Sequence, residues 1–329
     1  MANLLVAWQD AKPVNPVTGV KNPTVVNMSF GYNYAVTANA SVYTIANVNY
    51  RGNTYNTPGW GNTTYGLIFA QGKIPARVPA YDVYLDLMTA AGMIVCKAAG
   101  NDGMKIDVST GSDYNNSINV VYNSNSQPAL SGAKYMQGGS PMSNTAIIVG
   151  ALDSTTYSST LDKKAYYSDA GPMVDIFASG SNVQSACSNV ETLPQTPSDY
   201  YLNTSFKQIN ISGTSMASPQ IAGTAALYLQ AHPTATPAQV KSALTTIATT
   251  TMIGNISTNP TGNDYSNTVS QWGGNAGVAY QSIQGLIQVK GTGNTWQSPA
   301  NVLIKTSANA WTNIKASWTK TDAGWVQTY

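Results

Sequence analysis

Charged side chains are scarce in this sequence. Lysine, arginine, aspartate and glutamate together make up 9% of the 329 residues, where soluble domains average about 25%. Asparagine, serine, threonine and tyrosine take their place, so we expect a neutral, polar surface of the kind that suits a secreted or particle-borne protein. The formal net charge is only +2, which argues against nucleic acid as the main partner.

Histidine and cysteine are nearly absent, with one histidine and two cysteines in the chain. So few ligands argue against a zinc site. Cys96 lies in the apolar stretch 92–96, which is typical of a buried strand. We therefore expect Cys96 and Cys187 to be two unpaired core residues rather than a disulfide. No acidic cluster has the spacing of calcium ligands, and we expect no metal and no cofactor.

The sequence also has no long apolar run. None approaches the roughly 20 residues that span a bilayer, and the first residues lack the basic region and apolar stretch of a signal peptide. Residues 2–11 instead predict a helix that places Leu4, Leu5 and Trp8 on one face. We therefore expect no membrane partner.

Residues 1–255 alternate between helical and strand-like patterns. The strands are expected at 24–29, 92–98, 145–150 and 173–177, and the helices at 2–11, 80–91 and 214–230. A further helix begins at Thr236, because Thr236, Pro237 and Gln239 have the spacing of a capping box with proline at N1. Helices that alternate with short apolar strands predict an α/β domain, with a parallel sheet covered on both faces.

Three other regions have a different composition. Residues 32–79 are rich in tyrosine, asparagine, threonine and glycine and are too long for an ordinary loop, so we expect an insertion with strands of its own. Residues 256–282 are typical of a linker or irregular connection. Residues 283–329 repeat a Lys-Thr pair followed by Trp311 or Trp325, which predicts a small β module of hairpins that could associate with copies of itself.

The most informative string is GTSMASPQIAG at 213–223. It places Ser215 at the start of the expected helix, where free backbone N–H groups and the helix dipole favour negative charge. A serine hydroxyl needs an adjacent base before it can act as a nucleophile. The alternative is that Thr214 or Ser215 merely caps the helix, which explains one hydroxyl but not the whole string.

The string resembles the nucleophile motif of the subtilisin-like serine proteases. Three more segments are similar to that family in order and spacing: VVNMSFG at 25–31, AAGNDG at 98–103, and SDAGP with VDIFASG at 168–180. The resemblance covers about residues 1–250. Four matching segments in sequence are far more specific than one.

The resemblance implies roles for five residues. Ser215 would be the nucleophile of a serine endopeptidase, and Asn101 would donate to the oxyanion that forms on the substrate. The backbone of Ser29, Phe30 and Gly31 would pair with an extended polypeptide substrate. Each of these assignments is carried over from the family motif onto the matching position of this chain.

The base that the family uses is missing from these 329 residues. The family's aspartate occurs in Asp-Thr/Ser-Gly and its histidine in His-Gly-Thr-His, and neither string is present. The single histidine, His232, is expected to be a solvent-facing residue at the end of the nucleophile helix. Gln220 stands where the family often has a histidine without catalytic duty. We therefore expect a chain that is inactive alone and needs a second chain or an upstream segment to supply the aspartate and histidine.

Three explanations remain open: half of a split or processed protease, a fragment of an ordinary one, or a non-catalytic descendant kept as a virion or cell-surface structural protein. The hairpins of 283–329 resemble repeats at the ends of bacteriophage tail and other virion proteins. The expected location is accordingly extracellular or virion-associated.

Overall fold

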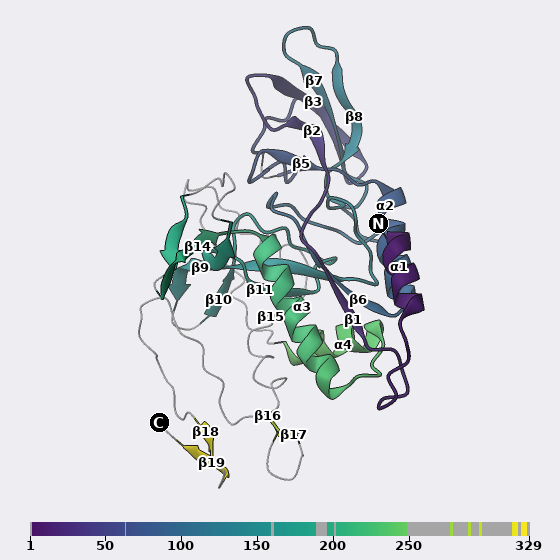
Figure 1. The fold of residues 1–329 in the computed structure, drawn as a ribbon. Coiled ribbons are helices and arrows are strands. Elements are labelled where there is room, and N and C mark those ends of the chain that lie inside the picture. Colours follow the sequence, from purple (N-terminus) through teal and green to yellow (C-terminus); the bar gives the residue numbers. More distant parts are fainter. Residues whose placement is uncertain are drawn as a thin grey trace.

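The structure is a computed structural model that describes residues 2–62, 64–158, 161–188, 196–200 and 202–248, together with short strand segments between residues 277 and 327. Figure 1 shows a central sheet flanked by helices, with a smaller group of strands at one end. The described helices are α1 (Ala2–Ala11), α2 (Pro79–Ala90), α3 (Thr214–Ala231) and α4 (Pro237–Ile247). Within these ranges, no helix combines the length and the apolar character that a bilayer span requires.

The central sheet is parallel. Its strands in spatial order are β1 (Thr24–Met28), β6 (Met93–Ala98), β9 (Ile147–Ser158), β11 (Ile176–Ser179) and β15 (Gly277–Val278). Thr24 pairs with Met93, and Cys96 pairs with Ile147. β10 (Leu161–Lys164) adds an antiparallel strand beside β9. β1 lies at one edge and, among the described strands, pairs with β6 alone.

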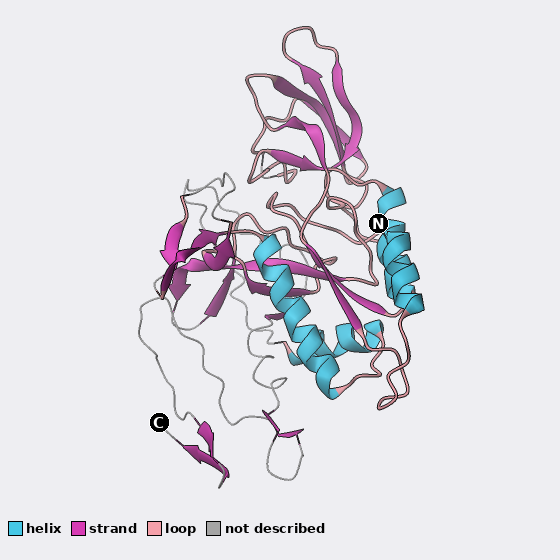
Figure 2. Ribbon diagram, in the orientation of Figure 1, coloured by secondary structure: helices cyan, strands magenta, loops and turns pink. Residues whose placement is uncertain are grey.

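Helices cover both faces of this sheet (Figure 2). β6 is buried along its whole length, as expected of a parallel strand covered on both sides. Ile94 and Cys96 face a cluster formed with α3 and α4. Met93 and Val95 face a second cluster formed with α1 and α2. The predicted α/β architecture is therefore confirmed.

The predicted start of α4 is also confirmed. Thr236 Oγ1 accepts a hydrogen bond from the Gln239 N–H at 3.3 Å, and Gln239 Oε1 accepts one from the Thr236 N–H at 2.9 Å. Both cysteines are free. Cys96 is buried, but Cys187 at the end of β12 (Val183–Cys187) is only half-buried, so its expected place in the core is wrong.

The helix expected at 2–11 is confirmed as α1. Leu4 is 74% exposed and Trp8 is 52% exposed, whereas Ala2, Leu5 and Val6 pack on the core and the Gln9 Oε1 accepts a 2.6 Å hydrogen bond from the Thr24 hydroxyl. One strand needs correction. The strand expected at 173–177 begins only at Ile176, because the preceding residues form a turn closed by a 3.0 Å bond between the Val174 N–H and the Gly171 carbonyl.

A second, antiparallel sheet forms at one end of the molecule (Figure 1). Its strands in order are β4 (Asn53–Asn56), β3 (Tyr43–Tyr50), β7 (Ser117–Tyr122) and β8 (Pro128–Lys134), beside a separate pair of β2 (Asn33–Thr37) and β5 (Lys73–Pro75). The expected insertion, 32–79, is thus completed by strands from 117–134, which the sequence had not indicated. Ile45, Val48, Leu67, Ile74 and Tyr135 are buried in its core.

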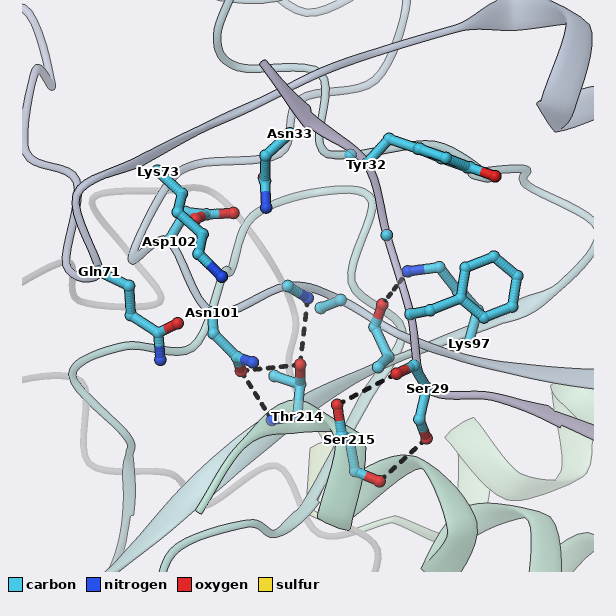
Figure 3. Close-up of a pocket in the computed structure, with 16 residues that line it drawn as sticks. Ser29, Tyr32, Asn33, Gln71, Lys73, Lys97, Asn101, Asp102, Thr214 and Ser215 are labelled. Carbon is cyan, nitrogen blue, oxygen red and sulfur yellow. Dashed lines mark hydrogen bonds between the residues drawn. The ribbon is translucent and has the colours of Figure 1, made fainter. Parts of the chain in front are cut away.

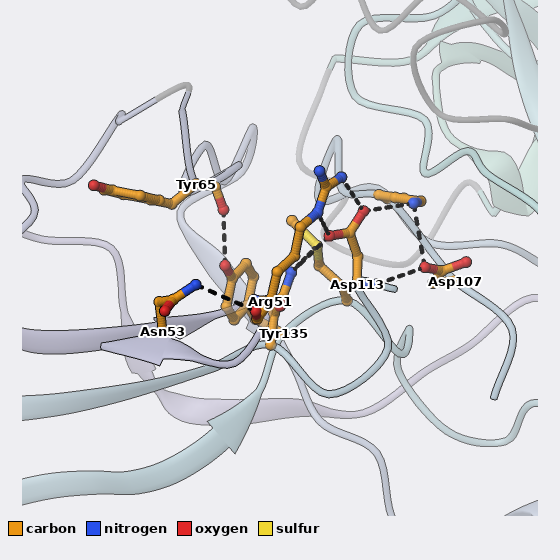
Figure 4. Close-up of polar contacts among 9 residues, drawn as sticks. Arg51, Asn53, Tyr65, Asp107, Asp113 and Tyr135 are labelled. Atoms are coloured by element: carbon orange, nitrogen blue, oxygen red, sulfur yellow. Dashed lines mark hydrogen bonds and ion pairs between the residues drawn. The ribbon is translucent and has the colours of Figure 1, made fainter. Parts of the chain in front are cut away.

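An ion cluster with two buried carboxylates lies beside this second sheet (Figure 4). Arg51, in the β3–β4 turn, donates to both carboxylate oxygens of Asp113 at 2.6 and 3.0 Å. Lys105 lies 2.7 Å from Asp113 and 3.2 Å from Asp107. Burial alone raises the pKa of Asp113, but the hydrogen bonds from Arg51 and Lys105 outweigh it and hold the pKa well below its usual value.

A third sheet leads into α3. Its central strand, β14 (Asn203–Ile211), pairs antiparallel with β12 and with β13 (Ser198–Tyr200). Two further antiparallel pairs are β16 (Val289–Lys290) with β17 (Trp296–Gln297), and β18 (Trp318–Thr321) with β19 (Gly324–Gln327). The rest of the predicted linker and β module lies outside the described residues, and the predicted domain boundaries stay predictions.

Candidate active site

Ser215 lies in the first turn of α3. The chain enters the helix through Gly213, whose N–H donates to the Gly180 carbonyl at 2.8 Å. Gly213 is the N-cap residue and has no side chain with which to cap the helix. The capping alternative for Thr214 and Ser215 is therefore wrong. Ser215 lies at the positive end of the helix dipole, where backbone N–H groups lack intrahelical partners.

Reciprocal hydrogen bonds join Ser215 to the end of the edge strand β1. The Ser215 hydroxyl donates to the Ser29 carbonyl at 3.3 Å, and the Ser29 hydroxyl donates to the Ser215 carbonyl at 3.0 Å. Asn27 supports this pair, because it donates to Ser29 Oγ at 3.0 Å and accepts from Ser218 at 2.8 Å. The backbone around Ser29 is thereby fixed to the first turns of α3.

Asn101 follows β6 and faces the same helix start (Figure 3). Its Oδ1 accepts from the Thr214 N–H at 2.8 Å and from the Thr214 hydroxyl at 3.0 Å. Because both of these hydrogen bonds use Oδ1, the Asn101 Nδ2 can donate a hydrogen bond to another group. A Cβ at Gly213 would lie 3.4 Å from this nitrogen, so the glycine leaves space beside it. This geometry suits a hydrogen bond from Nδ2 to an oxyanion.

Asp169 stabilises the loop that carries Asn101 by hydrogen bonds to its backbone. Its Oδ1 accepts from the N–H groups of Asp102 at 3.1 Å and Met104 at 2.8 Å, and its own N–H donates to the Gly100 carbonyl at 3.0 Å. Asp169 is 0% exposed, and its Oδ2 is buried without a hydrogen-bond partner. Burial, and then the neighbouring Asp102, raise the pKa of Asp169 well above its usual value.

Ser215 and Asn101 line a common pocket of about 180 Å³. The other lining residues are Ser29–Asn33, Gln71, Lys73, Lys97–Gly100, Asp102, Gly139 and Thr214. Burial raises the pKa of Asp102 to about 6 and lowers the pKa of Lys97 to about 8. The pocket therefore combines a nucleophile, an amide donor and charged groups in its wall.

No base is hydrogen-bonded to Ser215 among the described residues. His232 is the C-cap residue of α3, as predicted, and packs against Tyr228 with ring centroids 4.4 Å apart. It lies 17 positions after Ser215 in the sequence, which at 1.5 Å of helix rise per residue is roughly 26 Å. Gln220 donates hydrogen bonds to the Ser179 and Met216 carbonyls, so it does not act as a proton acceptor for Ser215.

The structure brings all five predicted site residues to one place: Ser215, Asn101, Ser29, Phe30 and Gly31 each line the same pocket. Sequence reasoning missed three residues that shape it. Thr214 lies inside the quoted motif and Asp169 inside another, but neither motif shows which contact its residue makes. Lys97 was not predicted as a site residue, because it lies within an apolar run that predicts a buried strand. In the described ranges, no cluster of histidine, cysteine and acidic residues could hold a metal ion.

A serine in the first turn of a helix, with an asparagine amide beside it and a shared pocket of about 180 Å³, is an arrangement that suits a serine hydrolase. Comparison with known families defines the class more closely. The model of the subtilase family, the family of subtilisin-like peptidases, matches residues 9–265, and the chain belongs to this family. The resemblance found in the sequence is thus confirmed.

Individual relatives are similar over part of their length. An extracellular serine proteinase of Thermus sp. (strain Rt41A) is 43% identical over 110 residues, which cover 33% of this chain and 22% of that protein. Subtilisin amylosacchariticus of Bacillus subtilis subsp. amylosacchariticus is 34% identical over 175 residues, which cover 53% of this chain and 33% of that protein. The chain thus matches a third or less of the length of these two relatives.

Among solved structures, a cold adapted subtilisin-like serine proteinase is 20% identical with a TM-score of 0.41. The match covers 85% of this chain and 62% of that one.

Proposed function

We propose that this chain is the nucleophile-bearing part of a subtilisin-like serine endopeptidase. The observation that carries the proposal is the shared pocket of Ser215 and Asn101, with the hydroxyl held by Ser29 and the amide oxygen held by Thr214. Family membership and the names of the relatives support the same activity.

The chemistry follows from this arrangement. Ser215 Oγ attacks the carbonyl carbon of a peptide bond while its proton passes to a base. The carbonyl oxygen becomes an oxyanion that accepts hydrogen bonds from Asn101 Nδ2 and from the Ser215 N–H. The base then protonates the leaving amine, an acyl-enzyme remains on Ser215, and water hydrolyses it.

The substrate is an extended polypeptide. Phe30 is 49% exposed, and Gly31 beside it is exposed and lines the pocket. A peptide that pairs with this backbone would place one carbonyl at Ser215. Main-chain pairing gives affinity for many sequences, so the choice among them depends on the pocket.

The base comes from polypeptide outside these 329 residues, because the only histidine lies at the far end of α3. Among the strands that the structure describes, β1 pairs on one side only, and this supports this part of the proposal. Ser29 directly follows β1 and contacts Ser215. Since the carboxyl ends of parallel strands meet at the same edge of a sheet, a strand added in parallel to β1 would end close to Ser215. An aspartate or histidine delivered there could complete the site.

The site of action is outside the cell, by analogy with the extracellular relative. Without the added segment, binding and the oxyanion donors alone would accelerate hydrolysis by roughly 10³–10⁴-fold over water, which is far below a working enzyme.

The test is covalent labelling of Ser215 with a fluorophosphonate probe, on the purified chain and on the chain mixed with extract of its native source. Ser215→Ala is the control in both. We expect labelling only in the mixture and none of the variant. Absence of labelling in both would contradict the proposal and leave a non-catalytic virion or cell-surface protein that keeps the subtilisin-like fold.

A further inference from the structure

A buried lysine lies in the wall of the pocket beside Ser215. Lys97 is 1% exposed, and its ammonium group donates a hydrogen bond to the Ala98 carbonyl. An ammonium has three donors and no acceptor. None of the ion pairs within the described ranges includes Lys97. A buried cation without a close anion is costly to maintain unless something pairs with it.

The position of the ammonium is compatible with contact from the pocket. A Cβ at Gly31 would lie in ordinary van der Waals contact with Lys97 Nζ, at 3.7 Å. The ammonium therefore lies directly behind the Gly31 backbone, which lines the pocket. Figure 3 shows the Lys97 amine beside the Ser29–Gly31 segment, opposite Lys73 and Asp102.

The charged side chains that line the pocket are Lys73, Lys97 and Asp102. Two ammonium groups thus face one carboxylate. Lys73 is exposed, whereas Lys97 and Asp102 are buried. Charges in a buried wall act more strongly than charges in water, because the surrounding medium screens them less. Asp169 lies behind this wall and also favours the charged form of Lys97. Among the side chains that line the pocket, the two ammonium groups outnumber the one carboxylate, which favours a negatively charged occupant.

We propose that this pocket selects an acidic side chain, with Lys97 as the specificity-determining residue. The inference rests on the proposed peptidase function, in which the residue that supplies the attacked carbonyl extends its side chain into the pocket between Ser215 and Lys97. A glutamate there gains an ion partner for its carboxylate, while glutamine, of the same shape, does not. Apolar and basic side chains are disfavoured by the uncompensated ammonium.

The test measures binding, so that it does not depend on the missing base. Fluorescein-labelled tetrapeptide amides that differ only in the last residue (glutamate, glutamine, leucine or lysine) are titrated with the full chain by fluorescence anisotropy at pH 7. The amide end removes the terminal carboxylate as a second anion. We expect glutamate to bind at least about tenfold more tightly than glutamine, which corresponds to about 1.4 kcal/mol.

Three variants test whether Lys97 causes the preference for glutamate over glutamine. Lys97→Met should abolish the preference for glutamate over glutamine, and Asp102→Asn should increase it. Lys164→Met is the matched control: Lys164 is also buried with a pKa lowered to about 8 by burial, but it does not line the pocket, so the preference should not change. Thermal unfolding of each variant checks that it is folded.

Equal binding of glutamate and glutamine by the wild type would overturn the inference, as would a preference that survives in Lys97→Met or disappears in Lys164→Met. Lack of binding by every peptide would overturn it too. Fluorophosphonate labelling of Ser215 is read separately: if labelling succeeds while the peptide preference fails, the peptidase function stands and only the acidic preference is wrong.

Discussion

Asp169 provides the sharpest test of how the fold positions the candidate oxyanion donor. Its Oδ1 is the acceptor for the N–H groups of Asp102 and Met104, on either side of the turn that follows Asn101. All three of these hydrogen-bonding residues are buried. Truncation to alanine would leave two buried donors unpaired, and each unpaired donor costs about 1–3 kcal/mol. Asp169→Ala is therefore expected to lower the free energy of unfolding by about 2–6 kcal/mol.

Asp169→Asn is the matched variant. The amide keeps an acceptor oxygen for both N–H groups, and the wild type already leaves the other oxygen without a partner. At pH 4, where the raised pKa of Asp169 costs little stability, we expect Asp169→Asn to remain within about 1 kcal/mol of the wild type, less than the cost of one unpaired buried donor at the upper end of its range. Urea unfolding at pH 4 gives both free energies by linear extrapolation, and hydrogen exchange of residues 100–104 reports the loop directly.

The pH dependence adds an independent check. Because the pKa of Asp169 is raised in the folded protein, the native state holds a proton that the unfolded chain releases above about pH 4. Stability should then fall as pH rises from that value through the native pKa. Asp169→Asn should remove this contribution. The reasoning is refuted if Asp169→Ala unfolds within about 0.5 kcal/mol of Asp169→Asn, or if hydrogen exchange of the loop is unchanged, since two unpaired donors must cost more.

Three further predictions concern stability. Burial lowers the pKa of Lys97 from 10.5 to about 8, so Lys97→Met should raise the free energy of unfolding at pH 7 by up to ~3 kcal/mol. The wild type should gain stability between pH 8 and pH 10.5, and this gain should diminish in the variant. No change in either quantity would count against a buried ammonium at this position. Asp113→Ala removes the closest anion of Lys105, which keeps Asp107 at 3.2 Å. The loss of the charged hydrogen bonds to Asp113 should cost about 1.5–3 kcal/mol in urea unfolding, whereas a loss below about 1 kcal/mol would be that of a surface pair. Thr236→Ala removes the capping box of α4 and should cost about 1 kcal/mol, with thermal unfolding as the measurement and Thr234→Ala, outside the cap, as the control expected to be neutral.

Local patterns predicted the elements that depend on local interactions. The apolar run at β6 is buried on both faces, so almost every side chain in it is apolar and the run alone predicts a buried strand. The capping box of α4 is a contact among neighbours in sequence. The candidate nucleophile and candidate oxyanion donor were predicted because the family motifs contain them, and Ser215 and Asn101 line the same pocket.

The parts that sequence reasoning missed depend on contacts between distant residues. The face of α1 that packs on the core carries Ala2, Leu5 and Val6, while Leu4 and Trp8 are exposed. β7 belongs to the second sheet because it pairs with β3, which is distant in sequence, and β8 then pairs with β7. Likewise, the bonds from Asp169 to the 102–104 backbone span more than sixty positions. No local spacing could have shown them.

The central claim is that Ser215 and Asn101 act together as nucleophile and oxyanion donor. The measurement that tests it most directly is the rate at which the fluorophosphonate probe labels Ser215 in Asn101→Ala, relative to wild type, in the mixture that labels the wild-type chain. In a subtilisin, loss of one such donor lowers kcat by about 10²–10³-fold, and we expect a fall of the same order here. An unchanged rate, with the labelled peptide still mapped to Ser215, would contradict the role of Asn101 and with it the account of this site.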